Sequence, residues 1–246
     1  MTNGHVPAVA FEGVSKSFGA KHILNDVSWS VPAGEAVCIL GRSGTGKSVT
    51  LKLIIALLKA DQGKVWIDQD EVSQLKESEI SRVRRKIGYL FQDAALFDSL
   101  TLYENLALPL HRLTRKSQDE IDFTIDRVLG QVGLAGDKAK MPSELSGGMR
   151  KRAGLARALV LEPKILLADE PSSGLDRITA SEIDELMLRQ KAEYKTTLII
   201  VTHDIHGARR VADRVLVLDR GKLIAQGTVA EVEQSENEIA RRLVSE

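Results

Sequence analysis

The chain has 246 residues, 43% of them hydrophobic, and its 34 basic side chains balance its 34 acidic ones. This length and apolar content allow one large domain, or a core with an inserted subdomain. The balanced charge excludes a global field that would steer nucleic acid or an anionic membrane toward the chain. One cysteine, Cys38, cannot form an internal disulfide, which suits a reducing compartment.

Targeting and nucleic-acid signals are weak. Residues 1–10 lack the basic and apolar regions of a signal peptide, and no apolar run approaches the roughly 18 residues that span a bilayer. Short basic runs at 82–86 and 150–152 have no interleaved aromatics, so we interpret them as solvated helix faces or phosphate-side contacts. We expect a soluble, cytoplasmic chain with no nucleic-acid partner, whose membrane role comes through another protein.

The chain opens with a strand pattern, which predicts an antiparallel β layer beside a parallel core. Residues 9–31 read as short strands, with turns at Phe18-Gly19 and Asn25-Asp26, and further strands are predicted over 35–40, 65–67 and 86–91.

The motif Gly41-Arg42-Ser43-Gly44-Thr45-Gly46-Lys47-Ser48 follows a predicted strand and precedes an apolar helix over 49–58. That order is the context of a phosphate-binding P-loop, in which glycines let successive N–H groups face phosphate oxygens. Lys47 supplies a cation for the β- and γ-phosphates, and Ser48 can ligate Mg²⁺. We assign the nucleotide to Gly41, Arg42, Ser43, Gly44, Thr45, Gly46, Lys47, Ser48 and Val49.

The next segment, 93–160, has a helical pattern and looks like an insertion between two strands of the core. Ser117-Gln118-Asp119-Glu120 is a capping box, and Gly133 closes the helix that it starts. A second helix is predicted from Ser146 to a point before Pro163.

The last third alternates buried strands and helices. The uniformly apolar run 165–168 and the β-branched run 197–201 are typical of central parallel strands, with a helix between them. A hairpin is predicted over 215–225, and one amphipathic helix over 228–246.

Asp169 and Glu170 end the apolar run 165–168, where carboxylates meet the P-loop in such folds. Asp169 would belong to the Mg²⁺ shell, and Glu170 would polarise the attacking water. The alternative is an ordinary acidic loop before Pro171.

Leu145-Ser146-Gly147-Gly148-Met149 offers a second anion site, because a hydroxyl and two glycines open a helix with bare N–H groups. The alternative is a flexible glycine hinge. One chain thus carries two phosphate-binding helix starts, although the γ-phosphate of one nucleotide can occupy only one P-loop.

These motifs together resemble the ATPase subunit of an ABC transporter over nearly the whole chain. The ordered set is Phe18, Gly41–Ser48, Gln92, Leu145–Met149, Ile165–Glu170, Ser173–Asp176 and His203. The resemblance implies an α/β P-loop NTPase with a RecA-like, mostly parallel core, an antiparallel β subdomain and an inserted helical subdomain. The single domain 1–246 would divide into core and β layer at 6–92 and 161–227, helices at about 93–160, and a C-terminal helix at 228–246.

The resemblance also assigns an assembly, in which two subunits pair head to tail and bury two MgATP. Each ATP would lie between one subunit's P-loop and the Ser146-Gly147-Gly148 of the other. Phe18 resembles the aromatic that stacks on adenine, and its alternative is a core Phe. Gln92 resembles the residue that reaches Mg²⁺ and the water; taken alone it would be a surface loop residue.

Two more roles follow from the resemblance. His203 is similar to the histidine that contacts the γ-phosphate, and the alternative is a histidine with a structural role. Asp176 is similar to the residue that communicates across the dimer, and the alternative is an ordinary helix N-cap.

Three classes of ABC protein compete. A transporter motor joined to a separate integral membrane permease is favoured, since non-transport members carry coiled-coil insertions or two cassettes, and Glu170 and His203 argue against a silent interaction module. The stretches 91–101 and 141–144 are similar to Mla/Mce-type ATPases, which move phospholipids and maintain outer-membrane lipid asymmetry.

That implies a peripheral protein on the cytoplasmic face of the inner membrane, with a small cytoplasmic accessory subunit and a periplasmic MCE lipid-binding protein as further partners. The alternative is an importer motor for amino acids or another small polar solute; the sequence encodes neither cargo nor direction.

Overall fold

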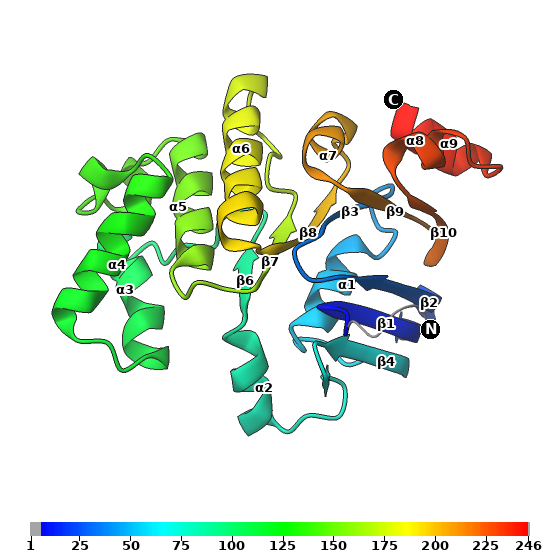
Figure 1. Ribbon diagram of the computed structural model, residues 1–246, viewed down its shortest axis with the longest axis horizontal. Coiled ribbons are helices and arrows are strands. Elements are labelled where there is room, and N and C mark those ends of the chain that lie inside the picture. Colours follow the sequence, from blue (N-terminus) through cyan, green and yellow to red (C-terminus); the bar gives the residue numbers. More distant parts are fainter. Residues whose placement is uncertain (1–5, 246) are drawn as a thin grey trace.

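The computed structural model describes residues 6–245, and its elements form two sheets with helices around them (Figure 1). Residues 1–5, half of the stretch searched for a signal peptide, and residue 246 lie outside the described part. The smaller sheet has the order β2-β1-β4-β5, with antiparallel pairing throughout. Its strands are β1 (Val9–Phe18), β2 (Lys21–Val31), β4 (Gln62–Ile67) and β5 (Asp70–Glu71).

The larger sheet has the order β10-β9-β3-β8-β7-β6 and is parallel except for its edge strand β10. Its strands are β3 (Ala36–Leu40), β6 (Ile87–Leu90), β7 (Ile165–Asp169), β8 (Thr197–Thr202), β9 (Arg214–Asp219) and β10 (Lys222–Gly227). Every residue of β3, β7 and β8 is buried, as expected of strands covered on both faces. This mixed sheet with its antiparallel companion confirms the predicted α/β class.

Alternation along β3 divides the core in two. Val37 and Ile39 face the cluster that helix α1 (Lys47–Ile54) fills between the two sheets, while Ala36, Cys38 and Leu40 face the cluster under the helices on the other side. Cys38 is therefore a core residue, and burial raises the pKa of its thiol far above the ordinary value.

Most of the helices cover the outer face of the large sheet and extend past its β6 edge, whereas α1 lies between the two sheets. Helices α3, α4 and α5 form the block at the left of Figure 1, inside the segment 93–160. The α-helices are α1 (Lys47–Ile54), α2 (Glu77–Arg84), α3 (Leu102–Leu113), α4 (Gln118–Gln131), α5 (Gly147–Leu159), α6 (Arg177–Tyr194), α7 (Ile205–Val211), α8 (Val229–Glu233) and α9 (Glu238–Ser245), with 3₁₀ turns at Ala135–Asp137 and Pro142–Glu144.

Helix starts follow the capping chemistry of the sequence. The Ser117 hydroxyl accepts from the Glu120 N–H, and the Glu120 carboxylate accepts from the Ser117 N–H at 2.7 Å, which confirms the capping box. Ser146 caps α5 by accepting from the Met149 N–H at 3.2 Å, so this helix begins and ends where it was predicted.

Three predicted elements are wrong in detail. Helix α1 ends at Ile54, short of 58, because Ala56 turns left-handed at φ +53° and the Leu57 N–H bonds back to the Lys52 carbonyl. Asn25-Asp26 is an irregularity inside the long strand β2 and not a turn between strands.

The tail forms two short helices, α8 and α9, where one helix over 228–246 was predicted. Asn237 interrupts it, because its side-chain oxygen accepts from the Ala240 N–H at 3.1 Å and starts a new helix. No helix within residues 6–245 combines the length and apolar character needed to cross a membrane.

Candidate active site

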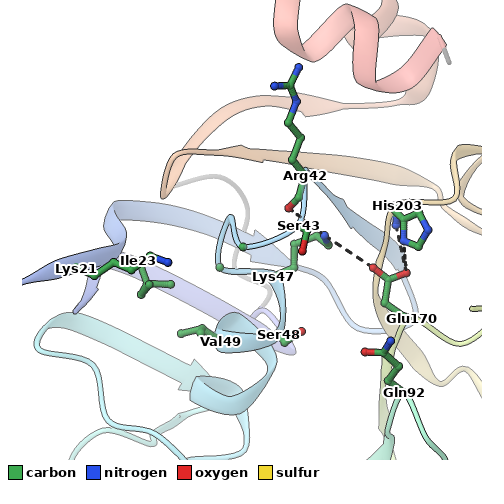
Figure 2. A pocket seen from close by; sticks show the side chains of 12 residues that line it. Lys21, Ile23, Arg42, Ser43, Lys47, Ser48, Val49, Gln92, Glu170 and His203 are labelled. Atoms are coloured by element: carbon green, nitrogen blue, oxygen red, sulfur yellow. Dashed lines mark hydrogen bonds and ion pairs between the residues drawn. The ribbon is translucent and has the colours of Figure 1, made fainter. Parts of the chain in front are cut away.

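The P-loop lies between β3 and α1 and lines a hollow of about 630 Å³ (Figure 2). The hollow is lined by Lys21, Ile23, Arg42, Ser43, Gly44, Gly46, Lys47, Ser48, Val49, Gln92, Glu170 and His203. Residues from five separate segments of the chain therefore meet where the carboxyl ends of β3, β6, β7 and β8 come together.

Two glycines of the loop are required by its geometry. Gly46 has φ +104°, and a Cβ there would lie 2.7 Å from the Leu24 side chain. Gly41 packs so closely on the β9 end that a Cβ would lie 2.4 Å from the Leu218 carbonyl oxygen. The loop can therefore curl tightly, and the first residues of α1, Lys47, Ser48 and Val49, line the hollow. Thr45 faces inward instead and donates to the Arg42 carbonyl at 2.9 Å.

Lys47 is 8% exposed and sits at the floor of the loop. Its Nζ donates to the Gly41 carbonyl at 2.8 Å and lies 3.8 Å from Glu170 Oε1. Burial lowers the pKa of Lys47, and the charges of Glu170 and Asp169 oppose that shift. A buried cation at the floor of this loop is suited to a polyphosphate.

Glu170 lies between a cation and an imidazole, as Figure 2 shows. Its Oε2 is 2.9 Å from His203 Nδ1 and accepts from the His203 N–H at 3.3 Å. The Glu170 side chain is 13% exposed, whereas that of His203 is 70% exposed. The exposed imidazole excludes a buried structural role for His203, and Glu170 is not part of a free acidic loop.

Asp169 is buried behind Glu170 at the end of β7. Its Oδ1 accepts from the Ser48 hydroxyl at 3.0 Å, and Tyr89 donates to Oδ2 at 3.4 Å. Burial raises the pKa of Asp169, the Ser48 hydrogen bond lowers it, and the neighbouring Glu170 charge raises it again. Ser48 and Asp169 thus form a hydroxyl–carboxylate pair beside the phosphate loop.

Of two further predicted site residues, Gln92 lines the hollow and Phe18 does not. Gln92, exposed in the loop after β6, reaches the hollow beside Glu170 (Figure 2). Phe18 is 48% exposed at the end of β1, with Lys16 Nζ 5.5 Å from its ring centroid. The core alternative for Phe18 is therefore wrong, and stacking on a base stays a prediction.

Sequence reasoning missed Lys21 and Ile23, which line the hollow from β2. Both follow Phe18 directly across the turn of the β1–β2 hairpin. Phe18 is predicted to lie near the base, and the first residues of β2 pair with the end of β1. That neighbourhood was the signal that could have identified Lys21 and Ile23.

The second glycine motif lies elsewhere. None of Ser146, Gly147 and Gly148 lines the P-loop hollow, and Gly147 lines a separate hollow of about 370 Å³ with Gln92 and Ser173. Asp176 is the N-cap of α6, accepting from the Ile178 and Thr179 N–H groups at 3.0 Å each. The capping interpretation of Asp176 is confirmed, and its cross-dimer role stays a prediction.

Comparison with known proteins places these motifs in one family. The model of the family described as "ABC transporter" matches residues 24–173. The "Probable ribonucleotide transport ATP-binding protein mkl" of Mycobacterium leprae is 43% identical, over 99% of this chain and 71% of its own. "Protein TRIGALACTOSYLDIACYLGLYCEROL 3, chloroplastic" of Arabidopsis thaliana is 41% identical, over 94% of this chain and 72% of its own. "Methionine import ATP-binding protein MetN 1" of Paraburkholderia xenovorans is 38% identical, over 93% and 66% respectively.

Solved structures agree with this result. The ATP-binding cassette MJ0796, in a dimeric post-hydrolysis state bound to ADP and Pi, superposes with a TM-score of 0.83 at 35% identity, over 89% of this chain and 98% of its own. That protein is described as a bacterial ABC transporter cassette in a second dimeric structure. The chain therefore belongs to the ABC transporter family, as the ATP-binding cassette that hydrolyses ATP to drive transport.

Proposed function

We propose that two copies of this chain pair head to tail around two MgATP and that this dimer powers a separate membrane permease. One observation carries the proposal: the glycine-opened start of α5 does not line the P-loop hollow of its own chain. A single copy thus presents half of each nucleotide site. We retain the division into a RecA-like core with a β layer, a helical subdomain at about 93–160, and a C-terminal segment.

The site residues then take distinct roles in this proposal. The P-loop and Lys47 hold the β- and γ-phosphates, Glu170 takes a proton from the attacking water, and His203 contacts the γ-phosphate and orients Glu170. Phe18 stacks on adenine, and Asp176 contacts the other subunit. Ser48, Gln92 and Asp169 would hold Mg²⁺, which fits a cation that takes one or two carboxylates plus substrate phosphates. When bound, Mg²⁺ neutralises charge on the phosphate oxygens.

Head-to-tail pairing can be tested by complementation between two inactive variants. Lys47→Ala removes the phosphate cation and should weaken ATP binding by about tenfold or more. Gly147→Asp adds a carboxylate at the first position of α5, where a Cβ meets nothing within 4 Å and an acid stabilises the helix. The fold is kept, while the added charge repels a triphosphate.

Each variant alone should lose ATP hydrolysis, because every site of its homodimer is damaged. In a mixture, the heterodimer keeps one site with an intact P-loop and an intact glycine motif. Random mixing should restore at most about a quarter of the wild-type rate. A mixture as inactive as either variant alone contradicts the head-to-tail arrangement.

A permease surface is available beside the helical block. A groove of about 360 Å³ runs between β6, α3 and α5, lined by Tyr89, Phe97, Leu108, Pro109 and Arg157 among others. Phe97 is 52% exposed there, and the loop 92–97 joins this groove to Gln92 in the nucleotide site. We propose that the permease seats a cytoplasmic segment in the groove, which places the chain peripherally at the inner face of the membrane.

We propose phospholipid as the transported class. The stretches 91–101 and 141–144 support it, as does 41% identity with a plant relative named for a glycolipid. An amino-acid importer is the second candidate, favoured by the 38% identical relative named for methionine import. Neighbouring reading frames that encode a permease and a periplasmic MCE protein, with or without a small accessory subunit, would support lipid transport. A soluble solute-binding protein in that place would contradict it.

A further inference from the structure

Lys151 is a buried lysine of α5 that none of the roles above uses. It is 7% exposed, and it lies five residues after the cap Ser146, on the helix that opens with the glycine motif. A lysine is almost never this buried unless its charge is paired, so Lys151 requires partners inside the fold.

The Lys151 ammonium bonds to three separate segments. Its Nζ donates to the Gln92 carbonyl, to the Glu170 carbonyl at 3.1 Å and to Ser173 Oγ at 3.4 Å. An ammonium group has three N–H donors, so the contacts use all of them. They join the loop after β6, the end of β7 and the loop before α6 to one atom.

The Glu170 backbone needs such support. Glu170 has φ +47°, in the left-handed region that is unfavourable for a residue with a side chain. Its N–H continues the sheet by donating to the Val201 carbonyl at 2.9 Å, and its carbonyl also accepts from Ser173 Oγ at 2.9 Å. The turn between these two anchors aims the carboxylate toward Lys47 and His203.

The charge of Lys151 also matches its surroundings. Burial lowers the pKa of Lys151, and the negative charges of Asp93, Glu170 and Asp169 oppose this shift. A neutral donor such as an amide would supply two N–H groups and no countercharge for those carboxylates. Lysine thus satisfies the three acceptors and the local field together.

We propose that Lys151 is a positioning residue for ATP hydrolysis, which ties the Glu170 backbone to the helix that carries the glycine motif. The inference rests on the proposed role of Glu170 as the base. Removing the tie lets the strained turn relax and moves the carboxylate, while the P-loop that binds ATP stays intact. A displacement of about 1 Å can cost a hundredfold in rate.

The test compares Lys151→Met, Glu170→Gln and the double variant in the purified full chain. Lys151→Met should lower kcat by about tenfold to a hundredfold, with the KM for ATP within about threefold of wild type. In the Glu170→Gln background the same change should lower the residual rate by less than about threefold, since both act through one group. Lys86→Met is the matched control, because it removes another partly buried lysine, bonded to Asp68 at 2.8 Å, away from the site.

The outcomes separate the two proposals. Normal hydrolysis by Glu170→Gln overturns the base assignment and this inference with it. A slow Glu170→Gln beside a Lys151→Met within about threefold of wild type overturns the Lys151 inference alone. A Lys151→Met effect that multiplies fully in the Glu170→Gln background, or an equal loss of ATP affinity, also overturns it. Lys151→Gln, checked by circular dichroism, replaces the Met variant if the latter does not fold.

Discussion

At the scale of single residues, three features of Glu170 suit the role of general base proposed for it. It is mostly buried, it contacts an imidazole at 2.9 Å, and it lies 3.8 Å from Lys47, the cation proposed to bind phosphate. The backbone strain at φ +47° fits a group that is held in place for chemistry and not for packing.

Glu170→Gln keeps the shape and removes the charge. We expect kcat to fall by about a hundredfold or more, with ATP affinity changed only slightly, because the P-loop contacts remain. Single-turnover hydrolysis and nucleotide titration measure the two effects. A normal rate would remove Glu170 as the base.

Asp184 on α6 is a buried carboxylate whose charge lowers the stability of the fold. It is 5% exposed and lies next to α7. Burial raises its pKa from 3.8 to about 6, Arg210 opposes the shift, and the charges of Asp204 and Glu185 add to it. The protonated form is thus favoured in the folded state. The stability gained by burying Asp184 in its neutral form is fully present below about pH 4 and is lost as the pH rises through 6.

Asp184→Asn should therefore raise the free energy of unfolding at pH 8 by about 1–3 kcal/mol, with little gain at pH 4. Urea unfolding at both pH values measures the difference. Glu193→Gln, an exposed position near the end of the same helix, is the control and should change little. An equal gain at both pH values would show that charge burial is not the cause.

At the scale of elements, close contact between β6 and α5 joins the helical block to the core sheet. A Cβ on Gly88 of β6 would lie 2.3 Å from the Ala158 carbonyl and 2.9 Å from Pro163. In contrast, a Cβ on Gly130 of α4 would meet nothing within 4 Å. The same substitution should therefore have opposite effects at the two positions.

Gly88→Ala should destabilise the chain by about 1–3 kcal/mol, since strand and helix must separate. Gly130→Ala should stabilise it by about 0.5–1 kcal/mol, because alanine restricts the unfolded chain and favours helix. Urea unfolding curves of both variants decide the point. Destabilisation by both would mean that the local packing around α4 differs from the one described.

Elements were predictable where a local signal sufficed. The capping box at Ser117 and the cap at Ser146 placed the starts of α4 and α5, and uniform apolar runs placed β7 and β8. Errors came from backbone conformations that side-chain type does not reveal. The left-handed Ala56 shortened α1, and the left-handed Asp26 lies within a continuous strand β2.

At the scale of the whole molecule, the order of the motifs predicted the central residues of the site, but the sequence did not predict the residues that line its edge. Gln92, Glu170 and His203 come from distant segments, yet the structure brings all three to the P-loop hollow. Lys21 and Ile23 were missed because neither residue type marks a nucleotide site by itself, so their place next to Phe18 was the available signal. Their role depends on how the β1–β2 hairpin lies beside the loop, which is a property of tertiary packing.

The whole-molecule prediction concerns stability, because a ligand that binds between two copies stabilises the pair more than the single chain. With Glu170→Gln to prevent turnover, MgATP at a hundredfold excess over Kd should contribute about 2.7 kcal/mol, which for a chain of this size raises Tm by about 5–10 °C. Because the proposed bound state is a dimer, this Tm should also rise with protein concentration.

Two comparisons isolate the cause. The double variant Lys47→Ala/Glu170→Gln should show little rise in Tm, since it lacks the phosphate cation. Gly147→Asp/Glu170→Gln binds ATP through an intact P-loop but cannot close the dimer, so its smaller rise should be independent of protein concentration. If the Glu170→Gln shift is itself independent of concentration, ATP binds within one copy, and the isolated start of α5 must serve something other than nucleotide.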